Sequence, residues 1–311
     1  MATAISQPVA GARRIVLASA RPGWRDREAT FSWLMMALPL SFLLALVGYP
    51  FVYGIYLSLE SRPVAQPGVF VGLQNFIADA RDPVFWQVTR NTVVYTGVAT
   101  VLKMVGGLAL ALIINQSFRT KNLIRAALLL PFIVPTVLST VAWMWMLDPA
   151  FSVVNWVIVH AGLAERGPSW LGNPTLAMAS IIVINTWRGL PFYAITLLAG
   201  LQTIPLDLYE AATIDGAGSW TRFRYVTLPL LKPTILIVTT FSIIFTFADF
   251  QLVYVLTHGG PANATNLFAT YAFDIAMSGG QLGRGASVAL AMLPILGLLI
   301  IGLTVYMRGR E

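Results

Sequence analysis

Few residues in this chain could carry out covalent or metal chemistry. The sequence has no cysteine, which excludes thiol catalysis, disulfides and cysteine-ligated metals. Its two histidines, His160 and His258, are far apart and do not suggest a histidine-rich metal site. None of the three lysines stands in a GxxxxGK[ST] phosphate-binding loop, and no HExxH or GxSxG motif occurs. The sequence therefore predicts no catalytic residue, no metal site and no cofactor in this chain.

The composition predicts a membrane protein. Of the 311 residues, 57% are hydrophobic and only 11% are charged, and the mean hydropathy is +0.74. Soluble domains carry about 25% charged residues, so this composition excludes a soluble enzyme, a secreted domain and a disordered scaffold. The net charge of +7 comes from short basic clusters beside apolar stretches, without interleaved aromatic residues. That pattern is typical of membrane topology and argues against nucleic-acid binding.

Six apolar stretches are long enough to cross a bilayer as helices, which takes about 20 residues. The first is too long for the hydrophobic region of a signal peptide. Prolines inside or near the spans predict kinks. The predicted spans are 31–59, 91–115, 126–147 (between Arg125 and Asp148), 175–201, 234–256 and 286–307.

The basic residues predict the orientation. Thirteen fall in the two tails and in the loops that join the second span to the third and the fourth to the fifth, against five in the other loops. Because Lys and Arg accumulate on the cytoplasmic side, both termini are predicted to be cytoplasmic. The tail, 1–30, is predicted to be partly disordered. Two of the outward loops, 61–90 and 149–173, are each predicted to hold a short interfacial helix.

Three ionisable residues fall within predicted spans. Arg188 is a functional candidate because an arginine in the bilayer needs a cavity or a partner. It could bind hydroxyls of a neutral sugar or an anionic group, or it could pair with Asp249 or with an acid of another subunit. The long stem of Lys103 could snorkel to the interface. Asp249 lies near the predicted outer end of the fifth span, and its role could be limited to capping that helix end.

The loop between the fourth and fifth spans carries the most specific pattern. Thr203 is a candidate cap for a short helix that Gly216 would end in a left-handed conformation. A second short helix, 219–226, is predicted to stop at Pro229 and Pro233. Two short helices at a bend would form a narrow knob on the cytoplasmic face. A plain interfacial elbow is the alternative.

This loop resembles the "EAA" loop of binding-protein-dependent ABC importer permeases. The resemblance rests on Glu210-Ala211-Ala212, Asp215-Gly216-Ala217, Phe223, Leu228-Pro229-Leu230 and Pro233. The phrases FVGLQNF, NTWRGLPFYAITLLAGLQTIP and FADFQLVYVLTHGGP are similar to the carbohydrate branch of that family, the maltose and trehalose type. About two thirds of the chain takes part in the resemblance.

The resemblance implies an all-α type I permease fold in a bacterial inner membrane, with a domain at 31–311 and a coupling loop at 202–233. It implies a second permease subunit, two ATPase subunits that bind ATP and Mg, an external binding protein and a sugar substrate. The chain itself would not be an enzyme. In the coupling loop, the residues implied to contact or shape the ATPase junction are Glu210, Ala211, Ala212, Asp215, Gly216 and Ala217.

The resemblance also implies a sugar site in the fourth and fifth spans. Its residues would be Asn185, Arg188, Gly189, Phe192, Ser242, Phe245 and Thr246. Aromatic rings suit pyranose C–H faces, and the amide and hydroxyl groups suit sugar hydroxyls. Gly189 would let the sugar approach the backbone. A break in the helix at Pro191 could lie beside this approach. Arg188 departs from the maltose-type pattern, where an apolar residue stands. A packed interior whose polar groups bond neighbouring helices is the alternative.

Three other functions compete with this interpretation. A secondary transporter would need an ion-coupling carboxylate, and only Asp249 lies in a span. An intramembrane hydrolase lacks its motifs. ABC permeases for phosphate, amino acids, polyamines or an anionic solute, such as glycerol phosphate or a sulfonated or acidic sugar, share the loop and stay open as alternatives.

Overall fold

The structure is a computed structural model that describes residues 27–116 and 119–308. The predicted tail lies outside the described residues up to position 26, and its disorder stays a prediction. The chain divides into two units, 1–53 and 54–311, which are described separately. The first unit contains α1 (Arg27–Leu43), the π turn η1 (Leu44–Gly48) and the start of α2 (Tyr49–Ser58). The apolar stretch Phe31–Ser58 includes most of α1, the π turn and the whole of α2, in agreement with the first predicted span.

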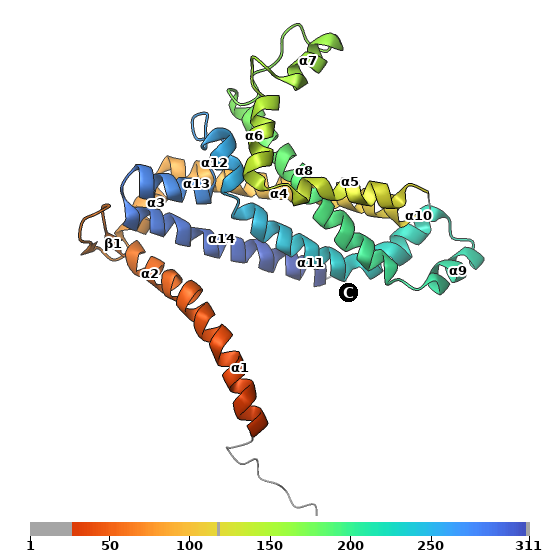
Figure 1. Cartoon of the computed structure of the whole chain (residues 1–311), viewed down its shortest axis with the longest axis horizontal. Helices are drawn as coiled ribbons and strands as arrows, with labels where there is room; N and C mark the ends of the chain where they lie inside the picture. The colour runs from red at the N-terminus through yellow and green to blue at the C-terminus, as the bar shows by residue number, and fades with distance from the viewer. Residues whose placement is uncertain (1–26, 117–118, 309–311) are drawn as a thin grey trace, which may run out of the picture. The chain divides into compact units, whose positions relative to one another are not determined.

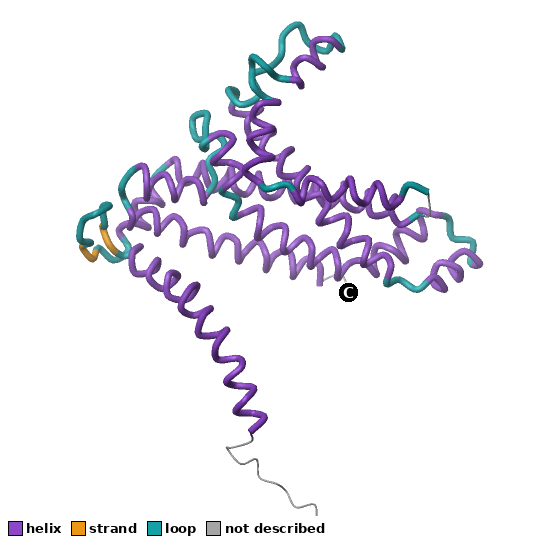
Figure 2. Tube along the Cα trace, in the orientation of Figure 1, coloured by secondary structure: helices purple, strands orange, loops and turns teal. Residues whose placement is uncertain are grey.

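Among the described residues of the second unit, the regular secondary structure is helical apart from one short antiparallel pair of strands (Figure 1; Figure 2). Glu60 lies opposite Phe70 in this pair. The sequence predicted no strand, and these two-residue strands lie in the loop after the first span. The elements in chain order are β1 (Glu60–Ser61), β2 (Val69–Phe70), α3 (Gln74–Arg81), α4 (Pro83–Asn115), α5 (Lys121–Ile133), α6 (Thr136–Met146), α7 (Val153–His160), α8 (Pro174–Gln202), α9 (Leu206–Ile214), α10 (Ser219–Arg222), η2 (Phe223–Thr227), α11 (Leu228–Phe247), α12 (Gln251–Thr257), α13 (Phe268–Phe273), η3 (Asp274–Ser278) and α14 (Leu282–Arg308).

Five helical stretches of the described residues are long and apolar enough to cross a membrane, and the pair α5 and α6 makes a sixth. The two helices of this pair meet at 94° around Val134 and Pro135. Val134 adopts the extended backbone that a following proline favours, and Pro135 has no N–H to continue the helix. The third span is therefore broken at a proline, where the sequence predicted a kink. The orientation of the termini stays a prediction.

The fifth span differs from its predicted limits, 234–256. The helix begins at Ser219, runs through the π turn η2 and ends at Phe247. The predicted stop at Pro229 and Pro233 is wrong, because the π turn shifts the hydrogen-bond register just before Pro229, whose missing N–H would otherwise interrupt it. Residues 248–250 then leave the helical path, and α12 begins at Gln251.

Small residues allow α4 and α8 to pack closely. A Cβ atom on Gly107 would lie 2.4 Å from Cβ of Tyr193 and 3.2 Å from the backbone nitrogen of Ala194. Glycine at such a crossing is typical of membrane helix pairs, because it lets the two backbones approach. Helix α11 packs against both α4 and α8, and α5 packs against α8. This group of helices forms the frame of the site described below.

Hydrogen bonds and ion pairs connect the N-terminal part of α14 to α3 and to the start of α4. Nε of Arg284 donates to Asp79 at 2.9 Å, a second guanidinium nitrogen donates to Asp82, and Ser287 also donates to Asp79. Burial alone would raise the pKa of Asp82, but hydrogen bonds from the Val84 amide and from Arg284 hold it below its usual value. Burial, together with the bond to Asp82, raises the pKa of Tyr271 to about 12.

Candidate functional site

One pocket of about 570 Å³ lies between α4, α8, α11 and the broken helix pair. All seven residues of the predicted sugar site line it, although they come from two spans that are separated by the coupling loop. Their roles stay predictions, while their placement together is a structural finding. The pocket is lined by Asn185, Arg188, Gly189, Phe192, Ser242, Phe245 and Thr246, with Lys103, Phe132, Thr136, Ala248, Asp249, Phe250 and Gln251.

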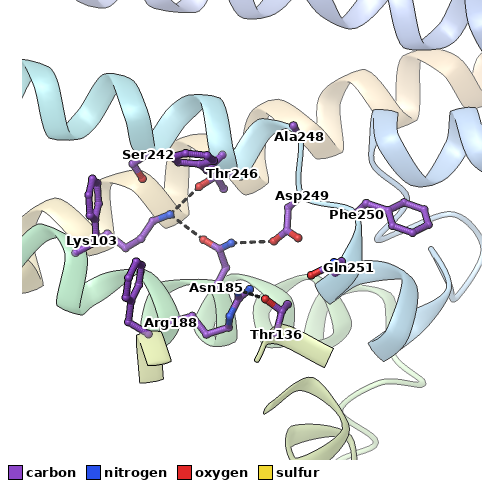
Figure 3. A pocket seen from close by; sticks show the side chains of 14 residues that line it. Lys103, Thr136, Asn185, Arg188, Ser242, Thr246, Ala248, Asp249, Phe250 and Gln251 are labelled. Carbon is purple, nitrogen blue, oxygen red and sulfur yellow. Dashed lines mark hydrogen bonds between the residues drawn. The ribbon is translucent and has the colours of Figure 1, made fainter. Parts of the chain in front are cut away.

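A buried hydrogen-bond network crosses this pocket (Figure 3). Nζ of Lys103 donates to Oδ1 of Asn185 at 2.8 Å and to Oγ1 of Thr246 at 2.7 Å. The amide of Asn185 then donates to Oδ2 of Asp249 at 3.0 Å, and the Tyr95 hydroxyl donates to the same oxygen at 2.7 Å. Asn185 therefore bridges the ammonium and the carboxylate. The network joins α4, α8, the end of α11 and the segment after it.

Lys103 is one of the lining residues that the predicted sugar site did not include. Its side chain is only 3% exposed and contacts two of the predicted sugar residues, so it does not snorkel. A lysine in this position must have hydrogen-bond acceptors, because an unpaired buried charge is costly. The only signal available in the sequence was its place inside a span. Asp249 likewise accepts bonds from two other helices, in addition to its weak contact with the first turn of α12.

Gly189 makes room for Lys103. A Cβ atom at this position would lie 2.4 Å from Cδ of Lys103. The space beside the glycine therefore holds the lysine stem, where the sequence interpretation expected a sugar to approach the backbone. The optional helix break at Pro191 is also absent from the described residues, because α8 continues from Pro174 to Gln202.

Replacing Gly189 by alanine is expected to lower the free energy of unfolding by roughly 1–3 kcal/mol, because the new methyl group overpacks the lysine stem. Tryptophan fluorescence during thermal unfolding of the purified protein would measure the change. Gly97→Ala is the matched control, since no atom lies within 4 Å of a Cβ there. Equal unfolding temperatures for the two variants would contradict the expected role of Gly189.

Arg188 lies half-buried on the wall of the pocket. Its Nη2 atom donates to Oγ1 of Thr136 at 2.6 Å, at the first residue of α6 (Figure 3). Within the part of the chain that the structure describes, no carboxylate lies within 4 Å of its guanidinium, so the option of an ion pair with Asp249 is not realised.

Aromatic and hydroxyl groups complete the pocket. Phe192 stacks on Phe132 with ring centroids 6.4 Å apart, and Phe245 is 70% exposed. The hydroxyl-bearing Ser242 and Thr246 are buried on the same helix, α11. Apolar faces beside hydroxyl, amide and cationic donors are an arrangement that can bind a polyhydroxylated ring.

The coupling-loop residues lie elsewhere, on α9 and the turn that follows it. Gly216 has φ +78, and the amides of Gly216 and Ala217 donate to the carbonyls of Thr213 and Ala212, at 3.0 Å and 2.8 Å. This is a Schellman end, as predicted for Gly216. The predicted cap was wrong: Thr203 bonds back to Gly200 and ends α8, and Pro205 precedes α9.

The exposed surface of α9 carries apolar side chains and two carboxylates, Asp207 and Glu210. Leu206 is 73% exposed and Ile214 is 87% exposed. Glu210 is also exposed, and its carboxylate has no hydrogen bond or ion pair with any other described residue. Ala211 is exposed and Ala212 is half-buried, while Asp215 forms the end of the helix. Residues Leu206, Tyr209, Glu210, Thr213, Ile214 and Arg222 line a shallow groove here.

A polar, charged pocket between apolar spans is typical of membrane transport proteins. The chain belongs to the family of binding-protein-dependent transport system inner membrane components, which matches residues 103–308. The resemblance found in the coupling loop is thereby confirmed, and so is the place of the chain in the inner membrane.

Curated relatives cover most of the chain. The trehalose/maltose transport system permease protein MalF of Thermococcus litoralis is 36% identical over 265 residues, which cover 85% of this chain and 89% of that protein. The sulfoquinovosyl glycerol transport system permease protein SmoG of Agrobacterium fabrum is 35% identical, with 86% and 88% covered. A solved bacterial ABC transporter involved in the import of the acidic polysaccharide alginate has the same fold, with a TM-score of 0.77, 21% identity, and 91% and 97% covered.

Proposed function

We propose that this chain is the permease subunit of an ATP-driven importer and forms half of the path for a sugar. The observation that carries the proposal is the pocket within the spans, which gathers all seven residues of the implied sugar site. The relatives named for trehalose/maltose and for sulfoquinovosyl glycerol support a sugar over a non-sugar solute such as phosphate or an amino acid.

The partners follow from the same proposal. A second, similar permease would complete the path, an external binding protein would deliver the sugar, and two ATPase subunits would bind ATP and Mg. The exposed apolar surface of α9, with its unpaired Glu210, suits docking into a groove of an ATPase subunit. Closure of the two ATPases would then move the membrane helices between inward-facing and outward-facing states. ATP hydrolysis would take place in the partner, and this chain would bind no cofactor.

Reconstitution of the complete complex in proteoliposomes tests the proposal. Uptake of labelled sugar is expected to require internal ATP and the sugar-loaded binding protein, and the chain alone is expected to show no ATPase activity. Uptake by the chain alone, driven by a proton or sodium gradient, would favour a secondary transporter and contradict the proposal. Uptake driven by ATP but limited to amino acids, phosphate or polyamines would retain the importer and overturn the sugar assignment.

A further inference from the structure

The charges in the pocket do not balance. Among the described residues that line it, three are ionisable, namely Lys103, Arg188 and Asp249. Lys103 and Asp249 lie on opposite sides of the Asn185 amide and each bonds to it, so the cation and the carboxylate offset each other. Arg188 is left as a cation without a counter-charge from the described part of this chain.

The guanidinium of Arg188 also has unused hydrogen-bond donors. It carries five N–H groups, and the structure shows one bond, from Nη2 to the Thr136 hydroxyl. A neutral hydroxyl cannot neutralise the charge. The side chain is neither fully exposed nor sealed in the protein, but borders a pocket large enough for a sugar unit. An arginine held at membrane depth is therefore available to a group that enters the pocket.

The geometry of a guanidinium favours one class of group. Its planar set of donors matches two oxygens of a carboxylate, sulfonate or phosphate, and charge-assisted bonds of this kind are about twice as strong as neutral ones. A neutral sugar hydroxyl would use the donors without offsetting the charge. Arg188 stands on the same helix as Phe192, one turn apart, so one molecule can reach both the cationic group and the aromatic face.

We propose that the transported sugar carries an anionic group, which Arg188 binds while the aromatic rings of Phe192 and Phe245 contact the sugar ring. This inference rests on the proposed function, because it narrows the sugar class without changing the importer. Lys103 stays engaged with Asn185 and Thr246, so Arg188 is the residue that distinguishes an acidic from a neutral sugar.

The complete importer, with its binding protein, in proteoliposomes provides the test. The probes are pairs of disaccharides in which one member carries an added or oxidised anionic group: cellobiose and cellobiouronic acid, maltose and its C6-oxidised acid, and trehalose and trehalose 6-phosphate. We expect at least one acidic member to be taken up in preference to its neutral match. Arg188→Gln should lower that uptake at least about tenfold, Arg188→Lys should retain part of it, and Arg166→Gln, at an exposed loop arginine, should leave it unchanged.

Each other outcome contradicts the inference. Uptake of neutral members only would overturn it and leave the proposed sugar importer intact, whereas an assembled, ATP-hydrolysing complex that takes up none of the sugars would overturn both. Uptake of the acidic sugar that is unaffected by Arg188→Gln would show that another residue binds the charge. Size-exclusion chromatography of the variants checks assembly of the complex. If Arg188→Gln dissociates the complex, Arg188→Lys restores it and substrate choice does not change, an acidic residue of the second permease is the counter-charge.

Discussion

Replacing Glu210 by lysine is expected to abolish ATP-driven uptake while leaving the membrane helices folded. Glu210 is exposed on α9 and makes no hydrogen bond or ion pair with the described residues, so its loss removes no contact within this chain. At a docked surface, however, a carboxylate that accepts charge-assisted bonds contributes strongly, and a lysine would place a like charge against the same donors. We expect a loss of at least about 2 kcal/mol in ATPase docking, or roughly thirtyfold in affinity.

Two measurements separate docking from folding in this variant. Co-purification with the ATPase subunits reports docking, and the unfolding temperature of the permease reports stability. Glu165→Lys is the matched control, because it makes the same charge reversal at an exposed glutamate outside the coupling loop. Normal uptake with Glu210→Lys, or equal loss of docking with Glu165→Lys, would show that the Glu210 carboxylate is not a specific contact.

The end of α9 at Gly216 was predictable because its determinants are local. Gly216 ends α9 in the left-handed conformation through bonds to residues three and five positions earlier, and such short-range constraints show in a motif. The end of the fifth span was not predictable from hydropathy. The apolar run continues through Leu256, whereas the helix ends at Phe247 and the chain turns so that Asp249 can meet Tyr95 and Asn185.

In the pocket, too, the contacts between residues that are distant in the sequence were the ones that could not be predicted. Resemblance to a family identified seven of its residues, but Lys103 contacts partners that lie 82 and 143 positions away in the sequence. No periodicity within one helix indicates such a contact, because it depends on the depth and rotation at which α4, α8 and α11 pack. The tight place of the lysine stem beside Gly189 depends on the same packing. The sequence therefore showed that a charged residue lies in an apolar span, but it did not show which residues Lys103 contacts.

Replacing Asn185 by leucine is expected to be among the most destabilising single changes in the pocket. Asn185 supplies an acceptor to the Lys103 ammonium and a donor to the Asp249 carboxylate, and leucine of similar size supplies neither. Lys103 would keep only Thr246, and Asp249 would keep Tyr95 and a long contact with the Leu252 amide. Because breaking a buried charged network costs about 3–5 kcal/mol, we expect a loss of about 3 kcal/mol, read as a lower unfolding temperature.

The cause of that loss can be isolated by removing the charges as well. Adding Lys103→Met and Asp249→Asn to Asn185→Leu should recover most of the stability, because a charge-free network leaves no ion without a partner. Thr96→Val is the matched control on α4: the Thr96 hydroxyl is buried without a hydrogen bond to any described residue, so its removal should change stability by less than about 0.5 kcal/mol. If the triple variant is no more stable than Asn185→Leu alone, the loss comes from packing at position 185, and the bridge between the two charges contributes little to the fold.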